Sequence, residues 1–189
     1  MSAESIRAGL GRLAATAGAL AGQADAIRTL ADRYRAVLES GGTIFFAGNG
    51  GSAAHAQHVA TEYVVRFGRN RRAFRAVALA ADAALLTAAG NDFGFAEVFA
   101  RQVEAHAGPG DLLVLHSTSG RSPNLLRAAE AARRAGAAVV ALLGGDGGDL
   151  AALVDQAVIV PTAETSRIQE LHLAIEHLIV ELVEEELGG

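Results

Sequence analysis

The sequence predicts an α/β fold in three layers, with a five-stranded parallel sheet between two layers of helices. Two observations lead to it. Short, continuous apolar runs, typical of strands buried on both faces, alternate with longer segments of helical periodicity. Polar or glycine-rich loops follow three of these runs, and in parallel sheets such loops gather at the carboxyl ends of the strands. The expected strands are residues 43–47, 76–79, 112–115, 138–143 and 158–160.

The N-terminal segment predicts two helices. Apolar residues recur at helical spacing from residue 5 to residue 39, and Gly22 marks the expected break between the helices. A chain of 189 residues favours a single domain. We therefore expect one domain over residues 1–189, with the helices of residues 1–40 used in packing or oligomerisation.

Helices are also expected between the strands and after the last one. Asp82 and Ser122 are typical N-caps, and the latter is followed by proline at the first helical position. Residues 91–95 are expected to form a turn. The expected helices are residues 52–62, 82–89, 95–107 and 123–135, a short helix after residue 148, and a long final helix over residues 166–187.

Composition excludes several kinds of function. The net charge of −5 argues against nucleic acid as the main partner. No apolar run approaches the roughly 18–20 residues of a membrane span, and the first residues lack the apolar region of a signal peptide. The chain has no cysteine, which removes disulfides and thiolate chemistry and fits a cytoplasmic protein.

All 16 basic residues are arginine, because the sequence contains no lysine. Schiff-base chemistry, a pyridoxal-phosphate anchor and the Walker lysine are therefore excluded. An anionic ligand would have to be held by backbone amides, hydroxyl groups or arginine.

A glycine-rich turn follows the first expected strand. Residues 48–53 read GNGGSA and match the permissive dinucleotide pattern G-x-G-x-x-A. That pattern also needs an acidic residue about 20 positions further on, and the nearest candidate, Asp82, lies beyond that distance. A nicotinamide-dependent enzyme is thus a minor alternative, and a tight turn that needs positive φ is the simpler interpretation.

A hydroxyl-rich loop follows the third expected strand. Ser117, Thr118, Ser119 and Ser122 lie between this strand and the next helix. The free amides and the dipole at the start of that helix favour an anion. The loop therefore predicts a phosphate site that needs no lysine, although an ordinary capped loop would look similar.

His58 and Glu62 stand four residues apart in the helix after the glycine turn. This spacing places both on one helix face, about 6 Å apart along the axis, and His55 lies near the same face. The two side chains could share a metal ion or a proton. A surface ion pair is the alternative for such spacing.

The final helix carries polar side chains among Leu, Ile and Val. Gln169 and His177 are eight residues apart, which is about 12 Å along one helix. Both can serve one site only if the helix start bends or if two subunits contribute. His172 and Glu176 form a rival pair, for which the simplest interpretation is an exposed ion pair.

Four separated motifs resemble the phosphoheptose isomerase family of the SIS (sugar isomerase) superfamily. They occur in order over nearly the whole chain, and together they are far more specific than any one of them. The motifs are GNGGSAAHAQHVATE (residues 48–62), GNDFGF (90–95), STSGRS (117–122) and RIQELHLAIEH (167–177).

The resemblance implies a flavodoxin-like SIS fold and a homotetramer with active sites at subunit interfaces. It implies isomerisation of D-sedoheptulose 7-phosphate to D-glycero-D-manno-heptose 7-phosphate through an enediol, the first step towards ADP- or GDP-heptose. Glu62 and His177 would be the catalytic acid/base pair, and one Zn²⁺ per subunit would be bound by His58, Glu62, Gln169 and His177. The implied substrate contacts are Asn49, Gly50, Gly51, Ser52, Glu62, Arg66, Asn91, Asp92, Ser117, Thr118, Ser119, Ser122 and Gln169.

Three positions depart from the family pattern. His55 stands where aspartate is frequent, His116 where a small or apolar residue is usual, and Arg121 where asparagine is common. None removes an implied ligand, but His116 and Arg121 bear on what the phosphate end accepts. The alternative function is a non-catalytic SIS protein that regulates by binding a sugar phosphate or a replication-initiation partner, and the presence of both Glu62 and His177 argues against it.

Overall fold

The computed structural model describes residues 2–188, so the ends of the domain expected over residues 1–189 lie outside the described residues. Its sheet has five parallel strands in the order β2-β1-β3-β4-β5. The three-layer α/β fold expected from the sequence is confirmed, and the strand bounds differ from the expected ones by two residues at most. The strands are β1 (Ile44–Gly48), β2 (Ala76–Ala78), β3 (Leu112–Ser117), β4 (Ala138–Gly144) and β5 (Gln156–Val160).

The helices follow the expected order, with one correction. Residues 91–93 do not form a turn, because the helix capped by Asp82 continues through them to Phe93, and the segment expected as one helix over residues 95–107 is divided in two. The helical elements are α1 (Ala3–Leu20), η1 (Ala21–Gln23), α2 (Ala24–Glu39), α3 (Gly51–Val64), α4 (Ala83–Phe93), η2 (Phe95–Glu97), α5 (Ala100–His106), α6 (Pro123–Ala135), η3 (Asp149–Ala152) and α7 (Thr165–Leu187).

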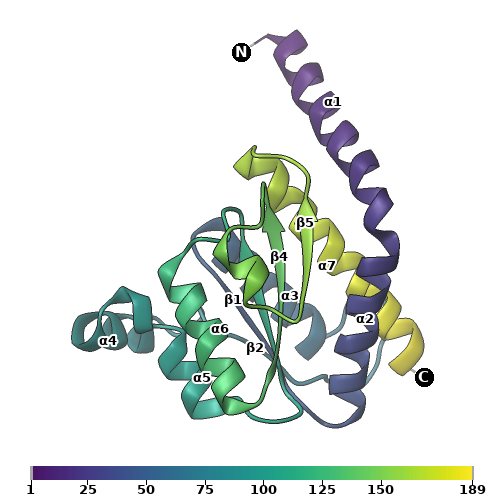
Figure 1. Ribbon diagram of the computed structural model, residues 1–189. Coiled ribbons are helices and arrows are strands. Elements are labelled where there is room, and N and C mark those ends of the chain that lie inside the picture. Colours follow the sequence, from purple (N-terminus) through teal and green to yellow (C-terminus); the bar gives the residue numbers. More distant parts are fainter. Residues whose placement is uncertain (1, 189) are drawn as a thin grey trace.

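Helices cover both faces of the sheet (Figure 1), and its central strands β1, β3 and β4 are buried, as their apolar sequences require. Successive side chains of a strand point to opposite faces, so Ile44 and Phe46 of β1 join one core cluster and Phe45 and Ala47 join the other. Helices α2, α3 and α7 cover the first cluster, and helices α4, α5 and α6 cover the second.

Helix α1 extends away from the body of the molecule (Figure 1). Its apolar residues recur at helical spacing, as the sequence indicates, but Ile6 is 52% exposed and Leu10 is 61% exposed. Its apolar face therefore lies largely outside the core of this subunit. Among the residues that the structure describes, no helix is both long and apolar enough to cross a membrane.

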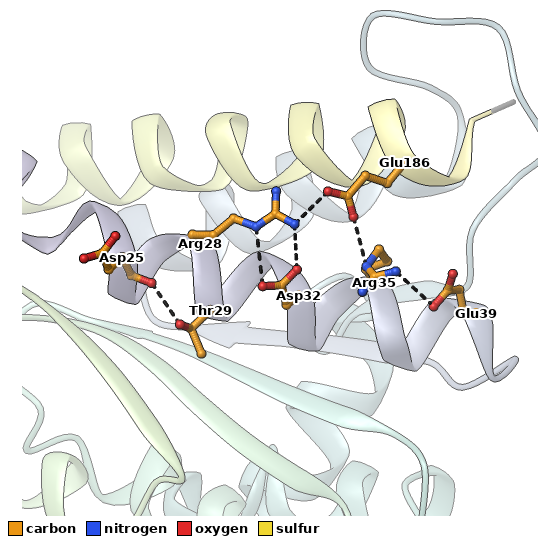
Figure 2. A network of polar contacts seen from close by, with 7 residues as sticks. All are labelled: Asp25, Arg28, Thr29, Asp32, Arg35, Glu39 and Glu186. Atoms are coloured by element: carbon orange, nitrogen blue, oxygen red, sulfur yellow. Dashed lines mark hydrogen bonds and ion pairs between the residues drawn. The ribbon is translucent and has the colours of Figure 1, made fainter.

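Charged side chains fasten α2 to α7 along their outer edge (Figure 2). Glu186 of α7 accepts from Arg28 at 2.7 Å and lies 2.9 Å from the Nε atom of Arg35. Asp32 also binds Arg28, at 2.8 Å, and these two carboxylates raise the pKa of the Arg28 guanidinium. Because α7 carries candidate site residues, this edge contributes to the position of the site.

Candidate active site

Helices α3 and α7 run side by side in the same direction and position the candidate site between them. At the start of α3, Gly51 lies against the side chain of Gln169, where an added Cβ would stand 2.7 Å from the Gln169 Nε2 atom. Gly50 before it has φ of 55°, a conformation that favours glycine. Two turns further along both helices, the His58 and His177 rings meet with centroids 5.3 Å apart.

Three predicted site residues form a cluster on these helices. His58 Nε2 lies 3.1 Å from His177 Nε2 and 3.3 Å from Glu62 Oε1. One ligand atom from each of the three residues lies within 4.8 Å of the others. The side chains of His58 and Glu62 are 47% and 21% exposed, so the cluster is open to solvent on one side.

The donor set of this cluster fits a divalent metal such as zinc. Two imidazole nitrogens and one carboxylate oxygen are ligands that Zn²⁺ accepts, and three protein ligands leave an open position in catalytic zinc sites. The two Nε2 atoms lie 3.1 Å apart, which is close enough for both to bind one ion with Zn–N distances of about 2.0–2.1 Å. His58, Glu62 and His177 are therefore the residues that would hold the metal.

The hydroxyl-rich loop forms a separate small pocket at the ends of β1 and β3. The pocket has a volume of about 60 Å³, and Gln169 lies in its wall. Ser117 accepts a hydrogen bond from the Gly120 amide at 3.0 Å, which closes the loop on itself. The lining residues are Asn49, Ser52, His116, Ser117, Thr118, Ser119, Ser122, Leu125 and Gln169.

Two polar contacts brace the loops around this pocket. Asn49 and Asn124 exchange hydrogen bonds at 2.9 and 2.8 Å, which fixes the glycine turn against the start of α6. Arg121 binds Asp146 through two hydrogen bonds of 2.9 and 2.6 Å and so joins the hydroxyl loop to the loop after β4. The Arg121 guanidinium, together with the Gly148 amide, lowers the pKa of Asp146 to about 2.

A buried ion pair supports the far end of α3. Arg71 donates to the carbonyl oxygen of Glu62 and to that of Tyr63 at 2.6 and 2.9 Å, and its Nε atom lies 2.9 Å from Glu184. Burial acts to raise the pKa of Glu184, but the amides of residues 67–69 and the Arg71 charge outweigh it, and the net shift is downward. The pair fixes the backbone of the helical turn that carries Glu62.

The known proteins that this chain is similar to belong to the family that the four sequence motifs resemble. The model of the SIS domain family matches residues 12–144. A phosphoheptose isomerase of Geobacter sp. (strain M21) is 51% identical over 162 residues, covering 86% of this chain and 82% of that protein. The chain belongs to the phosphoheptose isomerase family.

Solved structures of this family share the whole fold. A phosphoheptose isomerase from Francisella tularensis superimposes with a TM-score of 0.94 at 33% identity and covers 98% of this chain and 100% of that one. The phosphoheptose isomerase from Neisseria gonorrhoeae gives a TM-score of 0.91 at 37% identity, with coverage of 96% and 98%. The SIS fold inferred from the four motifs is confirmed.

Some substrate contacts that the family resemblance implies lie outside the cluster and the pocket. Asn91 and Asp92 lie exposed in the last turn of α4, where the Asn91 amide donates to Asp92 at 2.8 Å. Arg66 is exposed just beyond the end of α3. Gln169 lines the hydroxyl pocket of its own subunit, so its role as a metal ligand remains a prediction.

The interpretation of His172 and Glu176 as an exposed pair is wrong. Both side chains are buried, with 0% and 1% exposure. His172 lies 3.1 Å from the carbonyl oxygen of Leu143, and Glu176 contacts His116 and Tyr34 instead. The spacing of the two residues was correct for one helix face, but that face points into the core.

Sequence reasoning missed Arg71, Glu184, Tyr34 and the pairing of His116 with Glu176. One signal was present for the residues of α7: His172, Glu176 and Glu184 share the helical stripe of apolar residues that begins at Ile168. Polar residues on an apolar stripe indicate a buried polar network. No local pattern indicates which distant side chains complete it.

Proposed function

We propose that this chain is an aldose–ketose isomerase that converts D-sedoheptulose 7-phosphate to D-glycero-D-manno-heptose 7-phosphate. The observation that carries the proposal is the meeting of His58, Glu62 and His177 beside a pocket lined by hydroxyl groups. The 51% identical relative from Geobacter is named phosphoheptose isomerase, which supports the same substrate class.

The pocket and the cluster suit the two ends of such a substrate. The hydroxyl groups of residues 117–122 and the amides at the start of α6 bind the phosphate, which the helix dipole also favours. Gln169 at the pocket and His177 at the cluster are separated by about 12 Å of helix. An open seven-carbon chain with a terminal phosphate is extended enough to reach from one to the other.

The proton transfers are assigned to the cluster. Glu62 removes a proton from C1 of the ketose, and His177 donates a proton to the oxygen on C2, which produces the enediol. Return of a proton to C2 and loss of the proton from the C1 hydroxyl complete the aldose. The half-exposed face of the cluster gives the substrate its access.

We also propose that one Zn²⁺ per subunit binds to His58, Glu62 and His177, with Gln169 as the fourth ligand. When bound, the ion would polarise the C1 and C2 oxygens of the sugar. The chemistry of the donor set supports the first three ligands. Gln169 would reach the ion only by a contribution from a second subunit or by a shift of the start of α7.

The proposed assembly is a homotetramer in which the subunits complete one another's sites. Helix α1 presents Ile6 and Leu10 to solvent, and a mainly apolar groove of about 540 Å³ runs between α2 and α7. Asn91 and Asp92 are exposed at the end of α4, where another subunit can use them as substrate contacts. Sedimentation equilibrium should give four times the chain mass, and a concentration-independent monomer would contradict the assembly.

The test of function is turnover of D-sedoheptulose 7-phosphate in a coupled assay. The parent chain should release the aldose phosphate, and Glu62→Gln should lower kcat by about 10³-fold, because general acid–base catalysis contributes about 10²- to 10⁴-fold. Glu39→Gln, a change of an exposed glutamate at the end of α2, is the matched control and should keep the parent rate.

Two results would contradict the proposal. Near-parental turnover by Glu62→Gln would remove Glu62 as the base. Binding of the sugar phosphate by the parent chain without turnover, with zinc supplied, would favour a non-catalytic SIS protein.

The cytoplasmic location expected from the sequence stays a prediction.

A further inference from the structure

Three polar side chains meet inside the core, and two of them immediately precede candidate site residues in the sequence. They come from α2, β3 and α7: Tyr34, His116 and Glu176 are 0%, 0% and 1% exposed. Glu176 Oε1 lies 2.8 Å from His116 Nε2 and accepts a hydrogen bond from the Tyr34 hydroxyl at 3.1 Å. The His116 ring also stacks on Phe46, with centroids 6.1 Å apart.

Stability alone does not account for this group. A buried carboxyl group loses its hydration, and the Glu176 Oε2 atom and the His116 Nδ1 atom have no hydrogen-bond partner among residues 2–188. Well-packed apolar side chains of similar volume are often as stabilising as a buried pair of this kind, or more so. A directional role is the better explanation, because hydrogen bonds specify an arrangement that apolar contacts leave adjustable.

The position of the pair indicates what it directs. His116 immediately precedes Ser117 of the hydroxyl pocket and pairs with Gly48 in the register of β3 and β1. Glu176 immediately precedes His177, whose ring meets His58 at 3.1 Å. The hydrogen bond between His116 and Glu176 thus joins the backbone segments that carry the two halves of the site.

A second contact, one helical turn before Glu176, restricts the rotation of α7 about its own axis. His172 binds the carbonyl oxygen of Leu143 near the end of β4, the strand beside β3. Helix α7 is therefore held to the ends of two neighbouring strands from one face. A slide or rotation of α7 would break both contacts and would move His177 relative to His58.

We propose that His116 and Glu176, supported by Tyr34, form a buried clamp that positions His177 relative to the hydroxyl pocket for the isomerisation. Tyr34 and Glu176 lie outside the hydroxyl pocket, whereas His116 also lines it, and the clamp acts through the placement of α7. The inference rests on the site assigned under the proposed function.

The test replaces the clamp by apolar side chains. The double change His116→Leu/Glu176→Leu is made together with Tyr34→Phe, because the Tyr34 hydroxyl donates to Glu176, so this triple variant removes all three polar groups and no buried partner is left unpaired. It should fold, with a melting temperature equal to or above that of the parent. Its kcat should fall by about 10- to 100-fold, the size of effect seen when reacting groups are misplaced by about 1 Å.

Zinc binding supplies a readout independent of turnover. Competition of the metal-free protein with a chromophoric chelator should show about tenfold weaker Zn²⁺ affinity in the triple variant, since groups behind metal ligands commonly tune affinity by 10- to 100-fold. Glu176→Gln keeps an acceptor oxygen at the same place and should restore kcat and Zn²⁺ affinity to within about threefold of the parent. Ile175→Leu, a change of equal volume at the adjacent buried position, is the control for repacking and should change neither.

Parental kcat and Zn²⁺ affinity in the triple variant would overturn the clamp, and so would loss of activity in Glu176→Gln comparable to that of the triple variant. If the triple variant does not fold, the single variant Tyr34→Phe provides the test. It keeps the ring packed and removes one hydrogen bond, so about threefold lower kcat is expected. Parental values would overturn the proposal.

The two proposals fail differently. An active Glu62→Gln removes the site assignment, whereas an inactive Glu62→Gln beside a fully active triple variant removes only the clamp.

Discussion

His177 and Glu176 are neighbours on α7, yet each belongs to a different histidine–carboxylate group. His177 joins His58 and Glu62, whose side chains are 47% and 21% exposed. Glu176 joins His116, and both are at most 1% exposed. The distances within the two groups are similar, 3.3 Å from His58 to Glu62 and 2.8 Å from His116 to Glu176. The same residue types in the same contact therefore form an accessible candidate site in one place and a buried contact within the core in the other, and exposure to solvent distinguishes the two.

Solvent matters because it sets the cost of an unpaired charge. In an exposed pair, water replaces a missing partner, and the measured contribution of such a pair to stability is about 0–1 kcal/mol. In a buried pair nothing replaces it, so loss of one partner is costly. Substitutions in the exposed group should mainly change activity, and single substitutions in the buried group should mainly change stability.

The largest expected effect is the loss of activity in His177→Ala. It removes the proposed acid and one proposed metal ligand, so kcat should fall by about 10³- to 10⁴-fold, while the melting temperature stays close to that of the parent. His106→Ala removes an exposed histidine at the end of α5 and is the control, with parental kcat. A turnover within tenfold of the parent would show that His177 is not part of the chemistry.

The next effect is the loss of stability in Glu176→Leu as a single change. It leaves the His116 ring without its partner in the core, which should reduce the free energy of unfolding by about 3–5 kcal/mol. Glu62→Leu at the exposed group should change it by less than about 1 kcal/mol. Urea denaturation of both variants measures the difference, and equal losses would contradict the contrast between the groups.

The smallest effect, over the measured range from about pH 6 to pH 4, is a dependence of stability on pH that comes from His172. Burial, followed by the electrostatic interaction with the neighbouring His116 ring, lowers the pKa of His172 to about 3. The unfolded chain, with a histidine pKa near 6.5, therefore binds one more proton between about pH 6.5 and pH 3. Stability should fall as the pH drops through this window, by about 1.4 kcal/mol per pH unit from this group.

Replacement of His172 isolates that contribution. His172→Gln keeps a polar side chain near the Leu143 carbonyl and removes the titration, so its stability should fall less steeply between pH 6 and pH 4 than that of the parent. Denaturation curves at several pH values give both slopes. Identical slopes would mean that His172 is already protonated in the folded chain.

Part of the candidate site could be predicted from local patterns in the sequence. The four-residue spacing of His58 and Glu62 places them together on one face of any helix, and the structure has them 3.3 Å apart. The hydroxyl loop was expected at the end of a strand, and it lines a pocket there. Alternation of apolar strands with helices indicated the parallel sheet, since such strands must be covered on both faces.

Other features depended on packing between distant segments. The sequence by itself determined the class of fold, the order of the elements and which residues share a helix face. Only the tertiary structure decided that Gln169 lies against Gly51, that His177 meets His58, and that the face with His172 and Glu176 is buried. Helical periodicity depends on neighbours within one turn, whereas burial and partners depend on which segment packs opposite, and no local interaction specifies that.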